Sequence, residues 1–185
     1  MKKIVFLFVL LIAGCGISKP STFYHLQAAS KDAAVSQKNI TVGIDEVIVP
    51  KYADRPQMVM QEADSPELKI SEFNRWAEPL NFAIARILAD DISLYLPKST
   101  IKPRTYISEN FKYTISVEIS KFDITLNKQV ALDAWWTIFR NGNIIYQGRS
   151  RFSHPVDDNL NNVVEAQSQL INQMAEQIAL KLTKL

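Results

Sequence analysis

The sequence is poor in residues that build covalent cross-links, metal sites and phosphate-binding loops. Its 185 residues include one cysteine, two histidines and five glycines. The single cysteine, Cys15, excludes an internal disulfide, a cysteine-based zinc site and a cysteine nucleophile within the domain that follows it. The glycines do not cluster, so the chain has no glycine-rich phosphate loop. Without a disulfide, the fold must be stabilised by its apolar core alone. The hydrophobic fraction, 47%, is typical of a globular protein.

The chain also lacks a strong charge of either sign. Lysine and arginine number 21 against 19 acidic residues, which gives a net charge of +2. Loss of Lys2 and Lys3 with the N-terminal segment described next would bring that charge to zero. No basic run is present that could follow a phosphate backbone, so nucleic-acid binding is not expected.

The N-terminus has the pattern of an export signal. Lys2 and Lys3 precede the apolar run Ile4–Ile12, which is too short to cross a bilayer because a spanning helix needs about 20 residues. The ending Leu11–Cys15 resembles the lipobox of bacterial lipoproteins. That resemblance implies a signal peptide at residues 1–14, cleavage before Cys15 and acylation of Cys15. A secreted protein without lipid is the alternative.

Residues 15–22 are then expected to form a lipidated tether that keeps the domain close to the membrane. Two or three acyl chains on Cys15 would hold the chain stably, whereas one chain binds only marginally. By the rule for enteric lipoproteins, Asp after the cysteine favours retention in the inner membrane. Because Gly16 stands there, we expect the outer membrane, with the domain facing the periplasm.

Hydrophobic periodicity predicts strands followed by a helix, then strands and a second helix. The expected strands are residues 23–26, 40–49 with a bulge at Asp45-Glu46, 57–61, 68–73, 113–126 with a phase change near Ser120, 130–138 and 144–152. Asn141-Gly142 is typical of a two-residue hairpin turn. Helices are expected at 79–96, with Pro79 in its first position, and from Asp158 or Asn159 to about Leu182. Residues 27–39 are expected to form a loop.

This order predicts one α+β domain at residues 23–185, in which two amphipathic helices pack on one face of a mainly antiparallel sheet. In the second helix, Gln167, Gln169, Gln173 and Glu176 are expected mostly on its solvent-facing sides.

No catalytic or metal-binding constellation is found. His25 is expected in a strand and His154 in a loop, without the helical spacing that supports a two-histidine site. Asp90 and Asp91 are adjacent on the first helix, so they point in different directions and are interpreted as a solvated face. Neither an enzyme, a metal nor a cofactor is expected, apart from the covalent lipid on Cys15.

Two short segments and one tryptophan pair are candidate partner surfaces. The segments are Asp54–Gln57 and Phe73–Leu80. Arg55, Arg75 and Trp76 could form an interface, since Arg and Trp are favoured anchors. In the structural alternative, which we favour, Trp76 packs the strand-to-helix corner and Arg55 or Arg75 pairs with Glu78. Of Trp135 and Trp136, one must leave the core because adjacent strand residues face opposite sides.

Together these segments resemble the ABC-type transport auxiliary lipoprotein family over nearly the whole expected mature chain. The similar stretches are the lipobox, Phe23–Leu26, Val42–Ile44 through Val49-Pro50, Tyr52, Asp54–Val59, Phe73–Leu80, the strand with Trp135-Trp136 and the C-terminal helix. Phe23-Tyr24 stands where members often have Tyr-Tyr. Asp54–Gln57 and Arg75–Leu80 are the most specific pieces.

The resemblance implies a docking or adaptor component of an MCE-type, ABC-transporter-linked system for intermembrane lipid transport. Its expected partners are an MCE-domain protein of the periplasm, that protein's inner-membrane partner and the membrane itself, with self-association left open. Arg55, Arg75 or an exposed tryptophan could contribute to the docking surface. A lipid-binding carrier is the alternative, and it would require an apolar cavity of about 300 Å³ or more.

Overall fold

The computed structural model describes residues 19–30, 34–104 and 110–185, apart from the side chain of Glu46. The predicted signal peptide, Cys15 and the first part of the tether lie outside the described residues. Within them, the elements are β1 (Thr22–Tyr24), β2 (Thr41–Ile48), β3 (Gln57–Glu62), β4 (Leu68–Trp76), α2 (Leu80–Tyr95), β5 (Thr100–Pro103), β6 (Tyr113–Leu126), β7 (Gln129–Arg140), β8 (Asn143–Pro155) and α3 (Leu160–Thr183).

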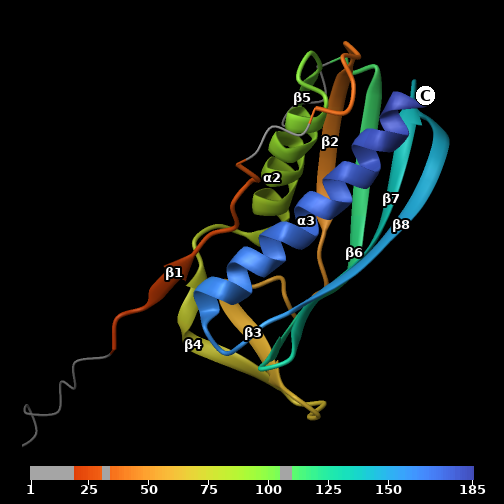
Figure 1. Ribbon diagram of the computed structural model, residues 1–185. Coiled ribbons are helices and arrows are strands. Elements are labelled where there is room, and N and C mark those ends of the chain that lie inside the picture. Colours follow the sequence, from red (N-terminus) through yellow and green to blue (C-terminus); the bar gives the residue numbers. More distant parts are fainter. Residues whose placement is uncertain (1–18, 31–33, 105–109) are drawn as a thin grey trace, which may run out of the picture.

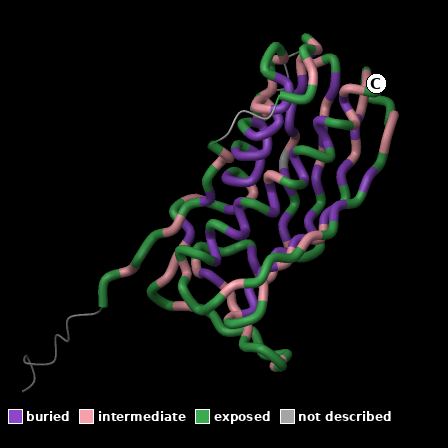
Figure 2. Tube along the Cα trace, in the orientation of Figure 1, coloured by how far each residue is buried: buried purple, intermediate pink, exposed green. Residues whose placement is uncertain are grey.

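Both helices cover the same face of the sheet (Figure 1). Helix α2 packs on β2 and β5, α3 packs on β7 and β8, and the two helices contact each other. The buried residues run along both helices and the strands behind them (Figure 2). The predicted α+β architecture, with two helices on one face of a mainly antiparallel sheet, is confirmed. None of the described helices is long and apolar enough to cross a membrane.

The antiparallel part is the meander β6–β7–β8, whose long strands alternate buried and exposed side chains. Asn141 and Gly142 both have positive φ, 51° and 78°, as the predicted hairpin turn requires. The register of β6 against β7 shifts between Ile119 and Lys121, which confirms the phase change near Ser120. A second shift in β2, between Ile44 and Val47, confirms the bulge at Asp45-Glu46.

The other strands branch from one side of β6. The first part of β6 pairs in parallel with β2, and its last two residues pair in parallel with β3. Strand β3 continues antiparallel to β4, and β4 continues parallel to β1. The short strand β5, which the sequence pattern did not predict, pairs in parallel with β2. The parallel pairs also escaped the sequence pattern, because they join segments far apart in the chain.

Helix boundaries lie close to those expected. Pro79 immediately precedes α2 rather than occupying its first position, with an extended ψ of 133°. The N-cap of α3 is Asn159, whose side-chain oxygen accepts the amide of Asn161 at 3.0 Å. The described part of segment 27–39 has no regular structure, as expected. These boundaries place the strand-to-helix corner at Trp76. Since both described helices pack on one face, no described helix covers the other face of the sheet.

Candidate functional site

The fold brings together the two segments that the sequence singled out, because the consecutive strands β3 and β4 pair antiparallel. Gln57 lies opposite Arg75 in the ladder, and the amide of Trp76 donates to the carbonyl of Pro56 at 2.7 Å. Strand β1 joins them from the other side. Phe23 lies beside Arg75, and the amide of Ala77 donates to the carbonyl of Tyr24 at 2.8 Å.

At this corner Trp76 is buried, so it packs in the core as the structural interpretation predicted. The expected partner of Glu78 was wrong. Glu78 forms an ion pair with Arg86, two turns along α2, while Arg75 donates through Nε to the backbone carbonyl of Glu72 at 3.3 Å. Arg55 is exposed. Arg86 lies on the solvent side of α2, where it reaches back to Glu78 in the turn that precedes the helix.

The outer side of this corner carries exposed aromatic and basic side chains. Phe23 is 62% exposed and Phe73 is 40% exposed. Lys19 lies over the Phe73 ring, with Nζ 5.8 Å from its centroid. Phe73 lies two residues before Arg75 in β4, and Phe23 is the cross-strand neighbour of Arg75. We call Lys19, Phe23, Phe73 and Arg75 the edge patch.

A second cluster lies on the face of the sheet that carries no helix. Trp135 is 49% exposed there, whereas Trp136 is buried on the helix side, so the expectation that one of the pair leaves the core is confirmed. The guanidinium of Arg149 lies 4.8 Å from the Trp135 ring centroid. Arg149 also donates two hydrogen bonds to Asp133, at 2.8 and 2.7 Å, and Arg151 lies 3.3 Å from the same carboxylate.

These four residues, Asp133, Trp135, Arg149 and Arg151, form what we call the sheet-face cluster. The hydrogen bonds from Arg149 hold the pKa of Asp133 below its usual value, so the carboxylate stays charged at neutral pH. The Asp133 carboxylate holds the Arg149 guanidinium in place through two hydrogen bonds, and this guanidinium packs against the Trp135 ring. The cluster therefore presents a pre-ordered aromatic surface surrounded by charge, an arrangement suited to protein contact.

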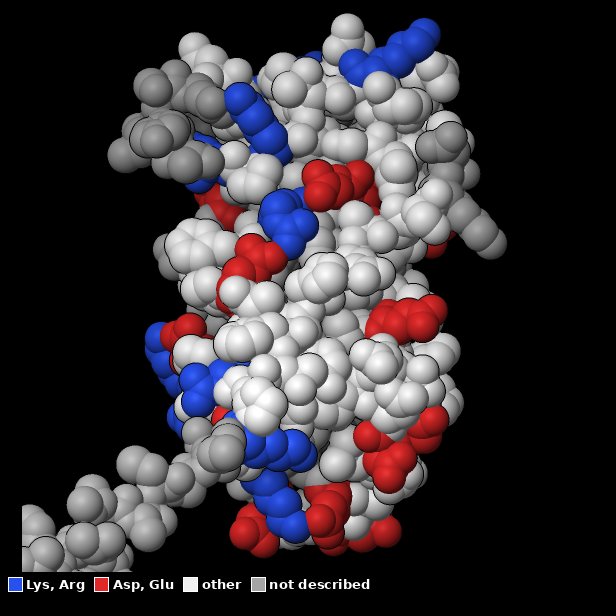
Figure 3. All heavy atoms as spheres, turned by 90° about the vertical axis from the view of Figure 1, so that its left-hand side faces the viewer, with Lys and Arg blue, Asp and Glu red and all other residues white. Residues whose placement is uncertain are grey.

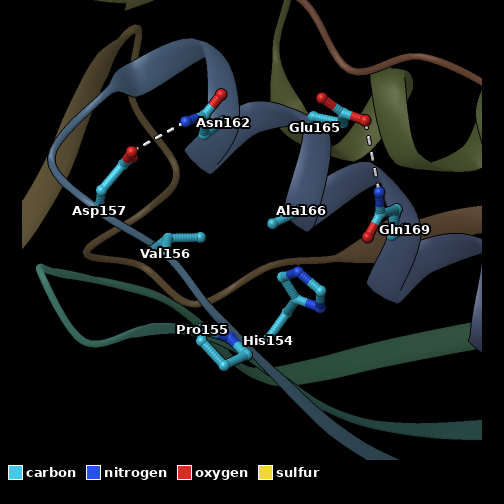
Figure 4. Close-up of a pocket in the computed structure, with 8 residues that line it drawn as sticks. All are labelled: His154, Pro155, Val156, Asp157, Asn162, Glu165, Ala166 and Gln169. Carbon is cyan, nitrogen blue, oxygen red and sulfur yellow. Dashed lines mark hydrogen bonds between the residues drawn. The ribbon is translucent and has the colours of Figure 1, made fainter.

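Three open clefts indent the described surface, with volumes of about 420, 610 and 410 Å³. Figure 4 shows the first, where His154 of β8 faces Ala166 and Gln169 of α3. His25 lines the second cleft, also beside α3. In the described ranges, no group of three or more metal-ligating side chains is found. These clefts are open and have mixed polar linings, unlike the enclosed apolar cavity that a lipid carrier would need.

Two buried polar side chains contradict the sequence interpretation. Asp91 was expected on a solvated face but is fully buried, and its Oδ1 accepts the amide of Ala29 at 2.7 Å. Burial raises the pKa of Asp91 to about 6, against the lowering effect of that hydrogen bond. Gln167, expected to face solvent, is also fully buried. Asp91 has the helical spacing of the buried residues Leu88 and Tyr95, so the spacing, and not the charge, is the sequence signal for its burial.

Asp91 therefore works as an internal acceptor for the N-terminal segment. Gln27 adds a second attachment, since its amide donates to the Ser168 hydroxyl at 3.1 Å. The two bonds hold residues 27–29 against α2 and α3. They account for the position of β1 at the corner, and hence for the position of the edge patch.

Comparison with known proteins assigns the class of the molecule. A model of the family described as the ABC-type transport auxiliary lipoprotein component matches residues 24–179, and the chain belongs to this family. It is 24% identical, over the full length of both chains, to the intermembrane transport lipoprotein PqiC of Escherichia coli K12 and to that of Shigella flexneri.

Solved structures show the same fold. A crystal structure of an uncharacterized protein has a TM-score of 0.73 at 20% identity, covering 89% of this chain and 99% of its own. A protein from Xanthomonas campestris has a TM-score of 0.70 at 11% identity, covering 86% of this chain and 93% of its own. At these identities the likeness supports the fold alone, so function must be argued from the surfaces.

Proposed function

We propose that this chain is the lipid-anchored docking component of an MCE-type intermembrane lipid transport system. The observation that carries the proposal is the sheet-face cluster, in which an exposed tryptophan is held by a paired arginine on a sheet face without a helix. Membership of the transport auxiliary family and the name of the PqiC relatives support a role in transport. The partner contacted by this face is an MCE-domain protein.

The cluster has the physical properties of an interface anchor. Tryptophan and arginine are the residues that most often dominate binding energy. Trp135 lies in a cross-strand row between Glu118 and Arg149, and Ile48 extends the row on β2 with 58% of its surface exposed. Because the strands fix this row, little side-chain freedom is lost on binding, which favours affinity.

Photocrosslinking from Trp135 tests the docking step in cells of the native host. A photoreactive phenylalanine at position 135 should form a covalent adduct with an MCE-domain protein. The matched control is position 180, where Leu180 is exposed on α3 and lies outside the cluster. Adducts only with unrelated envelope proteins, or equal adducts from both positions, would contradict the proposal.

Anchoring is the second part of the proposal. Cys15 lies outside the described residues, and its acylation is supported by the lipobox pattern and by the family. We propose the outer membrane as its location, with the domain facing the periplasm. Replacing Cys15→Ala should leave a folded domain without an anchor or an uncleaved precursor, which membrane fractionation and intact mass would show. The anchor would be disproved if Cys15→Ala fractionated with the membrane as the wild type does and the wild type carried no lipid.

A further inference from the structure

The edge patch is a second exposed surface, separate from the sheet-face cluster, and nothing in the proposed function occupies it. We propose that it lies against the surface of the bilayer that holds the lipid anchor, with Phe23 and Phe73 in the headgroup region. The inference rests on the proposed acylation of Cys15 and deepens it. The chain would be oriented on the membrane and not merely tethered to it.

The fold directs these side chains outward together. Phe23 and Arg75 are direct neighbours in the parallel pair β1 and β4, and the exposed Phe73 lies two residues before Arg75. The opposite side of β4 at this point carries the buried Trp76. Phe23 therefore cannot turn into the core without breaking the β1–β4 ladder. Figure 3 shows an area without charged side chains on the face that carries β1, β4 and α2, with charged groups along its borders.

Chain length brings this patch to the membrane. Lys19 lies against the ring of Phe73, and only three residues separate Lys19 from Cys15, which makes four steps from one Cα to the next. Four fully extended residues span about 14 Å at most. The headgroup region of one leaflet is itself several Å thick. A lipid-modified Cys15 would therefore keep Lys19, and with it the Phe73 ring beside its Nζ, close to that region.

The chemistry of the patch fits a lipid surface. Phenylalanine is among the apolar residues that surface-bound proteins bury at the boundary between headgroups and acyl chains. Lys19 and Arg75 flank the rings with positive charge, which favours anionic headgroups. The Lys19 ammonium itself lies over the Phe73 ring, so positive charge and aromatic surface occur together in the patch. A protein partner could also use exposed phenylalanines, but the short link to Cys15 leaves little space for one between the patch and the bilayer.

Site-specific fluorescence on the full acylated chain tests this contact. Acylation would block the sulfur of Cys15, so a cysteine introduced by Phe73→Cys or Phe23→Cys could be labelled alone with an environment-sensitive dye. The labelled protein is placed in vesicles of phosphatidylethanolamine and phosphatidylglycerol that carry a spin-labelled quencher near the headgroups. We expect quenching by about half at both positions. Trp135→Cys is the matched control, exposed on the sheet-face cluster, and should show little quenching.

The intact mass of the purified chain distinguishes a failure of the proposed lipid anchor from a failure of the proposed membrane contact. A chain without acyl groups would overturn the anchor and this inference together. An acylated, vesicle-bound chain with no quenching at positions 23 and 73, or with equal quenching at position 135, would overturn this inference alone. Crosslinking of position 73 to an envelope protein in cells, without quenching in vesicles, would also overturn it and assign the patch to a protein partner.

Discussion

At the scale of single residues, Gly148 determines how the two adjacent tryptophans divide between the faces. It lies opposite Trp136 in the β7–β8 ladder, and a Cβ atom there would lie 2.4 Å from Cζ2 of the Trp136 ring. Trp136 donates through Nε1 to the Ser150 hydroxyl at 3.0 Å and contacts the Tyr146 ring, 5.2 Å between centroids. The missing side chain of Gly148 thus makes room for Trp136 and leaves Trp135 for the open face.

Gly148→Ala should therefore destabilise the protein. The added methyl group must displace an indole that is packed and hydrogen-bonded, and overpacking of this kind costs about 1–3 kcal/mol. Chemical denaturation would measure the loss in the free energy of unfolding. Ser153→Ala, at an exposed position of the same strand, is the control and should change stability by less than about 0.5 kcal/mol. Equal stability of Gly148→Ala and the wild type would show that the Trp136 ring can move aside without cost.

Asp91 makes stability depend on pH. Its pKa in the folded state, about 6, is above the ordinary value of 3.8. Between these values the folded protein keeps a proton that the unfolded chain has lost, so the free energy of unfolding falls as pH rises from about 4 to about 6. We expect this group to contribute a fall of about 1–3 kcal/mol. Above the folded pKa its contribution no longer changes.

Asp91→Asn should remove that part of the slope, because the amide is neutral throughout and its oxygen can still accept the Ala29 amide. Denaturation curves at pH 4, 5, 6 and 7 would measure it. Asp90→Asn, on the exposed neighbour, should keep most of the slope, since the charge of Asp90 is the smallest of the causes acting on the Asp91 pKa. A slope that survives in Asp91→Asn would mean that the buried carboxylate is not its source.

At the scale of elements, Tyr52 closes the gap where the sheet branches. Its hydroxyl donates to the Asp123 carboxylate and accepts the amide of Phe122 at 3.3 Å. Both lie in β6 between the part that pairs with β2 and the part that pairs with β3. Burial and the hydrogen bond to Asp123 raise the pKa of Tyr52. The Tyr52 side chain thus supplies hydrogen bonds to β6 at the point where neither β2 nor β3 pairs with it.

Tyr52→Phe should lower the free energy of unfolding by about 1–2 kcal/mol, because the amide of Phe122 loses its acceptor and Asp123 loses its donor. Thermal or chemical denaturation would measure the change. Tyr24→Phe is the matched control, since no described residue hydrogen-bonds the Tyr24 hydroxyl, and it should be nearly neutral. If both variants lost the same stability, the hydroxyl of Tyr52 would have no special role at the branch.

The elements that the sequence predicted well are those with a local cause. The meander follows from alternating side chains, the hairpin from Asn141-Gly142, and the bulges from breaks in period. The parallel pairs and the short β5 have no such signal, because their hydrogen bonds depend on segments far apart in the chain. For the same reason the sequence could name Arg55, Arg75, Trp76 and Trp135 but could not group them. Trp76 belongs to the core, while Phe23 and Phe73 supply the exposed surface at that corner.

At the scale of the whole molecule, the two surfaces lie toward opposite edges of one sheet. The edge patch is on β1 and β4, and the sheet-face cluster is on β7 and β8, with β3 and β6 between them. A rigid sheet would therefore hold a partner at a fixed distance from the anchored edge. Docking on the sheet-face cluster would then fix the position of the partner relative to the membrane, because the fold sets the separation of the two surfaces.

Recovery of the partner from membranes of the native host tests the central claim of docking most directly. Affinity purification of the tagged wild type should recover an MCE-domain protein, and Leu180→Ala should recover as much. Trp135→Ala should recover at least about tenfold less, because loss of a hot-spot tryptophan costs about 2 kcal/mol or more and weakens binding about thirtyfold. Equal recovery by the folded Trp135→Ala protein, or no MCE-domain protein with the wild type, would contradict the account.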